Sequence, residues 1–282
     1  MRGFASGVFA WVPMWEIAQT LPGARAFHCA MDRLHPRAKE PRIAAAAMGG
    51  GNLLLAALPS VERRRLIARG ELVELTSGDV ICEQGERISH VYFPIYSFVS
   101  LLSSMDESSR LEVGLVGAEG MLGISLMLGV DIAPGRALVQ GTGSAVRLGA
   151  EQFSRELVQS PGLEQTLKQY LYIVMSQLAR TAACTRFHVI EARLARWLLM
   201  TRDRAHSNDF YLTHEVAASM LGVRREGITE SASALQRRKL IRYKRGNVTV
   251  LDGPGLEAAA CKCYSAATQI YARFMKYRGC YC

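Results

Sequence analysis

The stretch Leu212–Asp252 reads LTHEVAASMLGVRREGITESASALQRRKLIRYKRGNVTVLD, and it decides the fold of the C-terminal part of the chain. Thr213 is typical of a helix N-cap, because its hydroxyl can accept a hydrogen bond from a backbone N–H of the first turn. Gly222 is typical of a helix end, since glycine adopts positive φ at little cost. A second helix is predicted from Arg225 onward. Two helices joined by such a short turn are the helix-turn-helix pattern.

The apolar residues of this stretch fall where two crossing helices need them. Ala217 and Ala218 are small enough for a close crossing, and Val223 and Ile228 can fill the angle between the helices. The apolar face of the first helix is predicted to consist of Val216, Met220 and Leu221.

Two short strands are predicted after the second helix, over Leu240–Tyr243 and Val248–Leu251. The basic turn Lys244-Arg245-Gly246 joins them. A helix-turn-helix followed by such a hairpin is a winged helix-turn-helix.

The charge of this stretch fits DNA as a partner, since the residues before Asp252 carry a local net charge of roughly +5. In such motifs the first residues of the second helix meet base edges, and flanking cations meet phosphates. The residues predicted to read bases are Arg225, Glu226 and Thr229. Arg225 is suited to a guanine and Glu226 to a cytosine amine. The alternative is a solvated basic hairpin that binds nothing. The residues predicted to contact the DNA backbone are Arg224, Arg237, Lys244 and Arg245.

The composition suggests about two domains with different tasks. The chain has 282 residues and a pI near 9.4, which favours an anionic partner. Residues 70–150 instead carry four arginines against ten acids, so an acidic block precedes the basic one. The sequence contains no run of eighteen or more apolar residues, so no transmembrane helix is predicted. Seven cysteines in a chain of this length do not indicate a disulfide framework.

The first 47 residues differ from the rest. Phe4–Val12 is apolar and Ala24-Arg25-Ala26 resembles a cleavage site, but Pro13 and Glu16 interrupt the signal-peptide pattern. We expect a disordered extension, or a start codon assigned too far upstream, with Met48 as the natural first residue.

A helix is predicted over Asn52–Arg69, with a break at Pro59-Ser60, and the signals then change to strands. Glycines and polar turns separate short apolar runs, as in a small β-barrel or jelly roll. The predicted strands are Leu72–Leu75, Val80–Cys82, Val91–Phe93, Phe98–Leu102, Leu111–Val116 and Ala145–Leu148.

Two segments of this block carry a family resemblance. SGDVICEQGERISHVYFP (residues 77–94) resembles the early strands of the cyclic-nucleotide-binding β-roll, and VGAEGMLGISLML (residues 116–128) resembles the segment leading to its ligand pocket. Followed by a winged helix, residues 50–252 resemble the Crp/Fnr family of bacterial transcription regulators. The resemblance implies an α+β fold. The expected parts are an extension (1–47), a β-roll sensor (48–160), a dimerisation helix (161–188), a winged helix-turn-helix (189–252) and a C-terminal helix and tail (253–282).

The family implies an effector pocket inside the roll, where Gly123, Ser125 and Arg136 are the candidates. In cyclic-nucleotide-binding members a glutamate after a glycine binds the ribose, whereas Ile124 follows Gly123 here. Loss of that partner costs affinity, so cyclic AMP is not the expected effector. Arg136 is interpreted as a surface cation on a loop after Pro134-Gly135.

A long helix is predicted from Pro161-Gly162, with apolar residues at three- and four-residue steps. In the resembling family this helix pairs with its twin, which predicts a homodimer. The alternative is an ordinary core helix packed against the roll. The predicted dimer residues are Leu163, Leu167, Tyr170, Val174 and Leu178.

Cysteines form two close pairs in the tail, Cys261-x-Cys263 and Cys280-x-Cys282. Thiolates so placed could hold zinc or an iron–sulfur cluster. However, each pair is separated by one residue rather than two, and Cys261 and Cys263 would point about 200° apart on a helix. We therefore expect incidental thiols, with no cofactor and no metal site.

These observations predict a cytoplasmic, dimeric transcription regulator that binds a near-palindromic site on double-stranded DNA. RNA polymerase is expected as a partner, a small-molecule effector is possible, and no membrane partner is expected. No catalytic motif was found, so an enzyme is not predicted. The alternative is a ligand-binding signalling module that acts through a protein partner.

Overall fold

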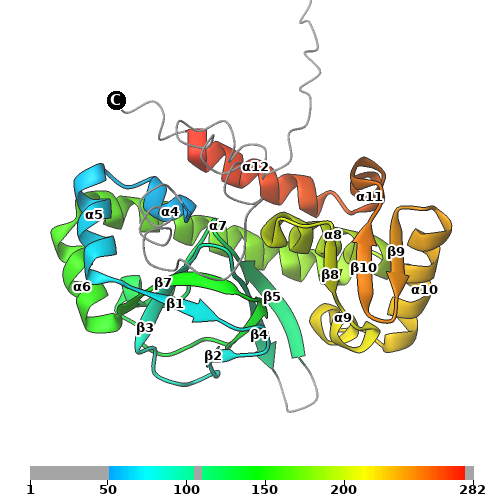
Figure 1. Ribbon diagram of the computed structural model, residues 1–282, viewed down its shortest axis with the longest axis horizontal. Helices are drawn as coiled ribbons and strands as arrows, with labels where there is room; N and C mark the ends of the chain where they lie inside the picture. Colours follow the sequence, from blue (N-terminus) through cyan, green and yellow to red (C-terminus); the bar gives the residue numbers. More distant parts are fainter. Residues whose placement is uncertain (1–50, 105–109, 277–282) are drawn as a thin grey trace, which may run out of the picture. The chain divides into compact units, whose positions relative to one another are not determined.

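The computed structural model describes residues 51–104 and 110–276, with side chains as far as residue 273 (Figure 1). The extension at 1–47, and Cys280 and Cys282, lie outside these ranges. The described chain begins with α4 (Leu53–Ala56) and α5 (Ser60–Arg69), which are separated at Pro59 as predicted. Asn52 caps α4 with its side-chain oxygen, while its amide donates to the carbonyls of Pro94 and Gly120 at 2.9 and 2.8 Å. This buried side chain therefore ties α4 to the roll.

Two antiparallel sheets form the β-roll. Strands β1 (Glu71–Leu75), β7 (Gly143–Gly149) and β3 (His90–Pro94) make one sheet, in that order. The other has the order β2 (Val80–Cys82), β6 (Arg136–Gly141), β4 (Phe98–Ser104) and β5 (Arg110–Val116). A short 3-10 helix, η1 (Ile124–Leu128), lies between β5 and β6. The α+β fold is thereby confirmed. The buried apolar side chains of the roll include Leu75, Val99, Val116, Leu122, Ala137, Val139 and Ala145.

Strand β6 was not predicted, and the interpretation of Arg136 as a loop residue is wrong. Arg136 is the first residue of β6, and its side chain is mostly buried beside Glu83. Pro134-Gly135 predicts a loop that includes Arg136. In the structure, Arg136–Gly141 instead alternates buried and half-buried residues, as a strand does.

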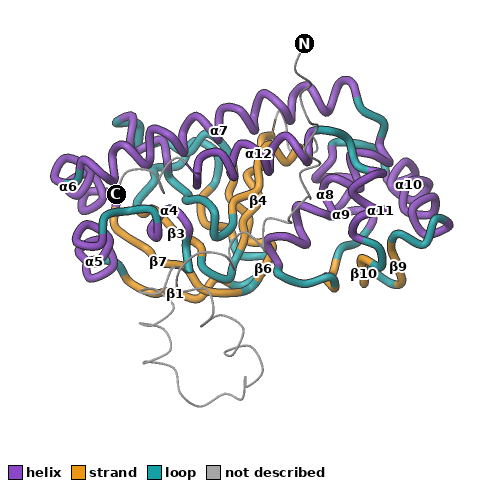
Figure 2. The backbone as a smooth tube through the Cα atoms, turned by 90° about the horizontal axis from the view of Figure 1, so that it is seen from above, coloured by secondary structure: helices purple, strands orange, loops and turns teal. Residues whose placement is uncertain are grey.

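After α6 (Ala150–Gln159), the long helix α7 (Pro161–Phe187) begins with proline at its first position. The carboxylate of Glu62, on α5, accepts the Leu163 N–H at 2.9 Å and so satisfies a free donor of the first turn. His188 ends the helix, and α8 (Ile190–Ala205) follows. Figure 2 shows α12 (Cys263–Lys276) beside α7, and Gln177 donates to the Tyr271 hydroxyl between them at 2.9 Å.

Much of the predicted dimer seam on α7 is wrong. Leu163, Leu167 and Tyr170 are buried within the chain, and the Tyr170 hydroxyl donates to the Met121 carbonyl. Because the three side chains already pack on the roll, they are not available to a second copy. This outcome matches the alternative of a core helix for the first half of α7. Val174 is half-buried and Leu178 is exposed.

The C-terminal part contains β8 (Asp209–Tyr211), α9 (His214–Leu221), α10 (Arg225–Arg237), β9 (Ile241–Lys244), β10 (Asn247–Val250) and α11 (Gly253–Ala259). The three strands pair in the order β8-β10-β9. The start of β8 was predicted to be a turn, because three residues are too few to show the alternation of apolar and polar side chains that marks a strand. The core beneath α9 and α10 includes Leu194, Trp197 and Leu198 of α8 and also Phe98, Leu102 and Leu115 of the roll.

Candidate nucleic-acid interface

The predicted caps of α9 are confirmed. Thr213 has an extended backbone, and its hydroxyl accepts the Val216 N–H at 3.1 Å. Gly222 ends the helix in the left-handed region with φ 60° and ψ 46°. Its N–H and that of Val223 bond to carbonyls of the last turn, which fixes the direction in which the chain enters α10.

The crossing of α9 and α10 is built as predicted, with one exception. Ala217, Ala218 and Ile228 are buried at the crossing, and Val223 packs against the same core. Val216 is 37% exposed, so its assignment to the apolar face is wrong. The face consists instead of Ala217, Ala218, Met220 and Leu221.

The first turn of α10 presents charged side chains to solvent. Arg224 caps the helix through its backbone alone, and Arg225 and Glu226 follow it. All three are exposed, and no salt bridge within the described chain involves them. A helix N-terminus with free guanidinium and carboxylate groups is suited to direct reading of base edges.

Thr229 is exposed as predicted, but its hydroxyl already has two partners. It donates to the Arg225 carbonyl at 3.1 Å and lies 2.9 Å from Nδ1 of His214. The His214 ring in turn meets the Tyr243 ring edge-on at 4.6 Å between centroids. Burial, followed by the charge of Arg225, lowers the pKa of His214. Thr229 therefore connects α10 to α9 and the wing, and its methyl group is the part left for a base.

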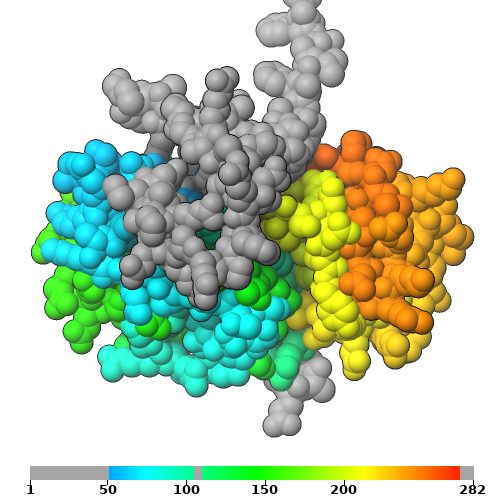
Figure 3. All heavy atoms as spheres, viewed as in Figure 1, coloured from blue at the N-terminus to red at the C-terminus, as the bar shows by residue number. Residues whose placement is uncertain are grey.

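The wing is a tight hairpin. Lys244 pairs with Asn247 across the turn, so Arg245 and Gly246 form a two-residue loop, and both have positive φ. This is the pattern of a type I′ turn, whose twist matches that of the strands. A Cβ on Gly246 would lie 2.5 Å from the Tyr211 ring. The wing, coloured orange, reaches the surface in the space-filling view (Figure 3).

The other cations of this surface divide into two groups. Arg238 pairs with Glu191 at 2.9 Å, and Arg242 donates to the Thr249 hydroxyl at 3.3 Å. These contacts hold both arginines against their own domain. Arg224, Arg237, Lys244 and Arg245, the residues predicted for the DNA backbone, are exposed and have no salt bridge among the described residues.

This geometry agrees with a comparison against known families. Residues 192–259 match the family described as Crp-like helix-turn-helix domain. The chain therefore carries a Crp-like helix-turn-helix domain. The matched segment begins within α8 and ends with α11, so it includes α9, α10 and the wing. DNA binding is therefore the activity of this domain.

Solved structures share the fold of most of the described chain. A regulator assigned to the crp/fnr family from Eubacterium rectale has 18% identity and a TM-score of 0.59, covering 74% of this chain and 98% of its own. The c-di-GMP responsive global regulator CLP of Xanthomonas campestris has 16% identity and a TM-score of 0.57, covering 68% and 99%. A CRP-family regulator from Thermus thermophilus has 20% identity and a TM-score of 0.57, covering 67% and 96%. No curated protein matches the chain by sequence.

The predicted effector residues lie in or beside the roll. Gly123 precedes η1 with φ 83°, and Ser125 lies within η1. The Ser125 hydroxyl and Nε of Arg136 are both buried without a hydrogen-bond partner among the described residues. Arg136 is 3.6 Å from Glu83, so its charge is partly neutralised within the chain.

Two polar contacts between the roll and α8 were not predicted. Trp197 donates to Glu112 of β5 at 3.0 Å, and Arg204 pairs with Glu119 at 2.6 Å, with all four side chains buried. Burial raises the pKa of Glu112 to about 7, although Ser100 and Trp197 donate to it. A lone glutamate within a strand pattern gives no sequence signal for such a contact. These contacts join the roll directly to α8, the helix beneath the helix-turn-helix.

Two cysteines of the tail lie beside residues that their spacing in the sequence does not predict as neighbours. Cys261 and Cys263 lie next to Cys184 and His188 at the end of α7.

No helix in the described ranges is long and apolar enough to cross a membrane.

Proposed function

We propose that the protein binds a near-palindromic DNA site as a homodimer and that an effector at the roll modulates this binding. Each copy would insert the N-terminus of α10 into the major groove. Arg225 and Glu226 would read bases there, with Thr229 contributing its methyl group. Arg224, Arg237, Lys244 and Arg245 would contact phosphates on either side.

The observation that carries this proposal is the exposure of Arg224, Arg225 and Glu226 on a well-anchored helix. Their side chains have no salt bridge in the described chain, whereas Arg238 and Arg242 nearby are held by internal partners. Because these arginines have no internal ion pair to break and the helix is already held in place, the free-energy cost of binding a phosphate or a guanine is small.

The second copy would pack against the exposed side of α7. Tyr172 and Met175 are 66% and 61% exposed there, and Leu178 lies one turn further along the helix. These residues replace Leu163, Leu167 and Tyr170 as the proposed dimer contact. A two-fold axis through this face would present two copies of α10 to successive major grooves, about 34 Å apart.

The proposed effector is a small polar molecule other than cyclic AMP. The Ser125 hydroxyl and Arg136 Nε, which make no hydrogen bond among the described residues, are the polar atoms that a ligand could satisfy. Ile124 stands where a ribose-binding glutamate would be needed, and Glu83 competes for the Arg136 guanidinium. Isothermal calorimetry with cyclic AMP should show no binding at micromolar concentrations, and tight binding would contradict this part of the proposal.

The test of the main proposal is selection of random duplex DNA on the purified full chain at near-physiological salt. We expect a two-fold symmetric motif with half-sites about one helical turn apart. Arg155→Ala, which removes an exposed arginine from α6, should return the same motif, and Arg225→Ala should not. If no motif is enriched, with or without a small-molecule extract of cells, sequence-specific binding is excluded.

A further inference from the structure

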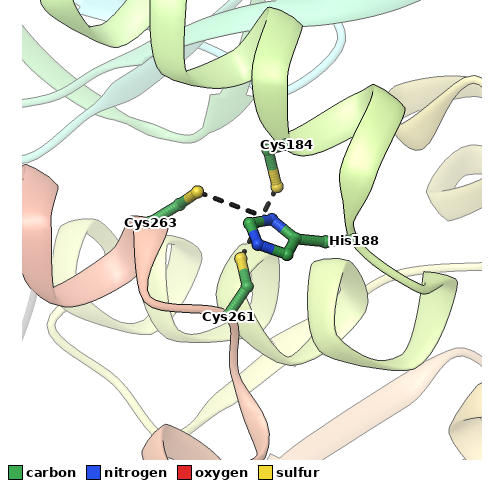
Figure 4. A group of neighbouring side chains, drawn as sticks. All are labelled: Cys184, His188, Cys261 and Cys263. Carbon is green, nitrogen blue, oxygen red and sulfur yellow. Dashed lines mark hydrogen bonds between the residues drawn. The ribbon is translucent and has the colours of Figure 1, made fainter.

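Four potential metal ligands converge where α7 ends and α12 begins (Figure 4). Cys184 is in the last turn of α7, and His188 is the residue that ends that helix. Cys261 lies in the link between α11 and α12, and Cys263 is the first residue of α12. The four ligand atoms all lie within 4.8 Å of one another, although the residues come from segments more than 70 positions apart.

The distances between these atoms match the edges of a metal-centred tetrahedron. The sulfurs of Cys184 and Cys261 are 3.5 Å apart, and the Cys263 sulfur is 3.6 Å from Nδ1 of His188. With Zn–S near 2.3 Å and Zn–N near 2.0–2.1 Å, a tetrahedral site requires about 3.8 Å between sulfurs and about 3.6 Å between sulfur and nitrogen. We propose that Cys184, His188, Cys261 and Cys263 form a structural Zn²⁺ site.

Zinc fits this donor set better than other groups do. Three thiolates and one imidazole are a common structural zinc set, whereas the octahedral sites of Mg²⁺, Ca²⁺ and Mn²⁺ use oxygen ligands. A single ion can reach all four atoms, because none is more than 4.8 Å from another. An iron–sulfur cluster has a larger body, and its thiolates must be spread further apart.

Three thiolates and an imidazole suit a divalent cation in charge as well as in geometry. Binding of Zn²⁺ would leave three thiolates on the metal and release their thiol protons to solvent, with no change of oxidation state.

The backbone around the site places the ligands before any metal is present. The His188 N–H bonds to the Cys184 carbonyl at 3.1 Å, and the Cys261 N–H bonds to the Ala192 carbonyl at 3.3 Å. Ala260 has an extended backbone that ends α11. Cys261 and Cys263 are thus not on one helix, and the expectation that their side chains diverge by about 200° is wrong. The signal that the sequence did contain is C-x3-H near residue 184 together with C-x-C at residue 261.

A metal at this site would link the segment between α7 and α8 to the start of α12. His188 occupies that joint, and α8 carries the DNA-reading domain. A bound ion would therefore restrict how α8 turns relative to α7. Because the ligands come from two segments far apart in the sequence, zinc would stabilise the folded chain by an amount set by its affinity.

The experiment is metal analysis of the full-length protein purified under reducing conditions and saturated with Zn²⁺, followed by removal of free ion. We expect about one tightly held zinc per chain. Replacement by Co²⁺ should give the intense visible bands of tetrahedral cobalt with thiolate-to-metal charge transfer. Zinc should also protect Cys184, Cys261 and Cys263 from alkylation, as read by peptide mass. None of these measurements requires DNA binding, so the site can fail or succeed independently of the proposed function.

Matched variants assign the ligands. Cys261→Ser with Cys263→Ser should weaken Zn²⁺ binding by at least about a hundredfold. Cys82→Ser, in β2, and Cys280→Ser with Cys282→Ser should retain the zinc. If the Cys261/Cys263 variant does not fold, the cobalt spectrum and alkylation pattern of the unmodified chain still decide the question. Three results would overturn the proposal. They are a chain that holds no zinc, loss of zinc in the Cys280/Cys282 variant, and a Cys184–Cys261 disulfide in protein isolated without oxygen.

Discussion

Arg225 is the first residue of α10, and its guanidinium is free of internal salt bridges in the described chain. Arg225→Ala should reduce discrimination at one base pair by about 1–3 kcal/mol, because a bidentate contact to guanine would be lost. Competition binding with single-base variants of the selected site would measure this effect. Arg155→Ala is the control, since it removes an equally exposed arginine from α6. Equal weakening on every DNA sequence would assign Arg225 to the phosphates instead.

Lys244 lies at the end of β9, beside the two-residue turn of the wing, and its ammonium is exposed. Lys244→Ala should weaken specific and non-specific DNA binding alike. It should also reduce the slope of log affinity against log salt by about 1, because one fewer counterion is displaced. Affinity measured over a series of salt concentrations tests this directly. A slope identical to that of the unmodified protein would remove Lys244 from the phosphate contacts.

At the scale of elements, the end of α9 sets the angle at which α10 is presented. Gly222 has φ 60°, and a Cβ there would also lie 3.0 Å from Leu111 of β5. Gly222→Ala should lower the free energy of unfolding by about 1–2 kcal/mol, since alanine is strained in the left-handed region. Chemical denaturation would measure the change. Gly149→Ala is the control, because its φ of −62° suits alanine and nothing lies near its Cβ. Equal effects of the two substitutions would contradict the argument.

Helix α7 presents a face that the roll does not cover, with Tyr172 and Met175 on it. Met175→Glu should convert a dimer into monomers, because two buried carboxylates would oppose each other across the two-fold axis. Light scattering during gel filtration would give the mass at each concentration. Val158→Glu, on α6, is the matched control, since Val158 is even more exposed. A Met175→Glu variant with unchanged mass would place the dimer contact elsewhere.

Elements with local signals were the ones that could be predicted. Thr213 and Gly222 mark α9 because caps depend on neighbouring backbone groups, and the Arg245-Gly246 turn follows from the same local chemistry. Burial on α7 could not be assigned, because apolar residues lie on several of its faces and only the tertiary fold chooses among them. Cys184 and Cys261 meet across 77 positions, which no local pattern reveals.

At the scale of the whole molecule, the roll and the DNA-reading domain share one apolar core and two buried polar contacts. The contacts from Glu112 and Glu119 to α8 connect the two parts without passing through α7. Replacing either partner would leave a buried polar group without its hydrogen bond, which makes these contacts costly to break one at a time.

Glu112 makes this connection sensitive to pH, since burial raises its pKa from 4.5 to about 7. Below about pH 4.5 the carboxyl is protonated in both folded and unfolded chains. As the pH rises toward 7, the unfolded chain loses the proton first, so folding stability falls and then levels off above about 7. The fall attributable to Glu112 should be about 3 kcal/mol.

Glu112→Gln keeps an oxygen for the Trp197 N–H and should flatten the profile by that amount in urea denaturation between pH 5 and 8. Glu151→Gln, an exposed change on α6, should leave the profile unaltered. Identical profiles for the unmodified chain and Glu112→Gln would show that Glu112 does not titrate in this range.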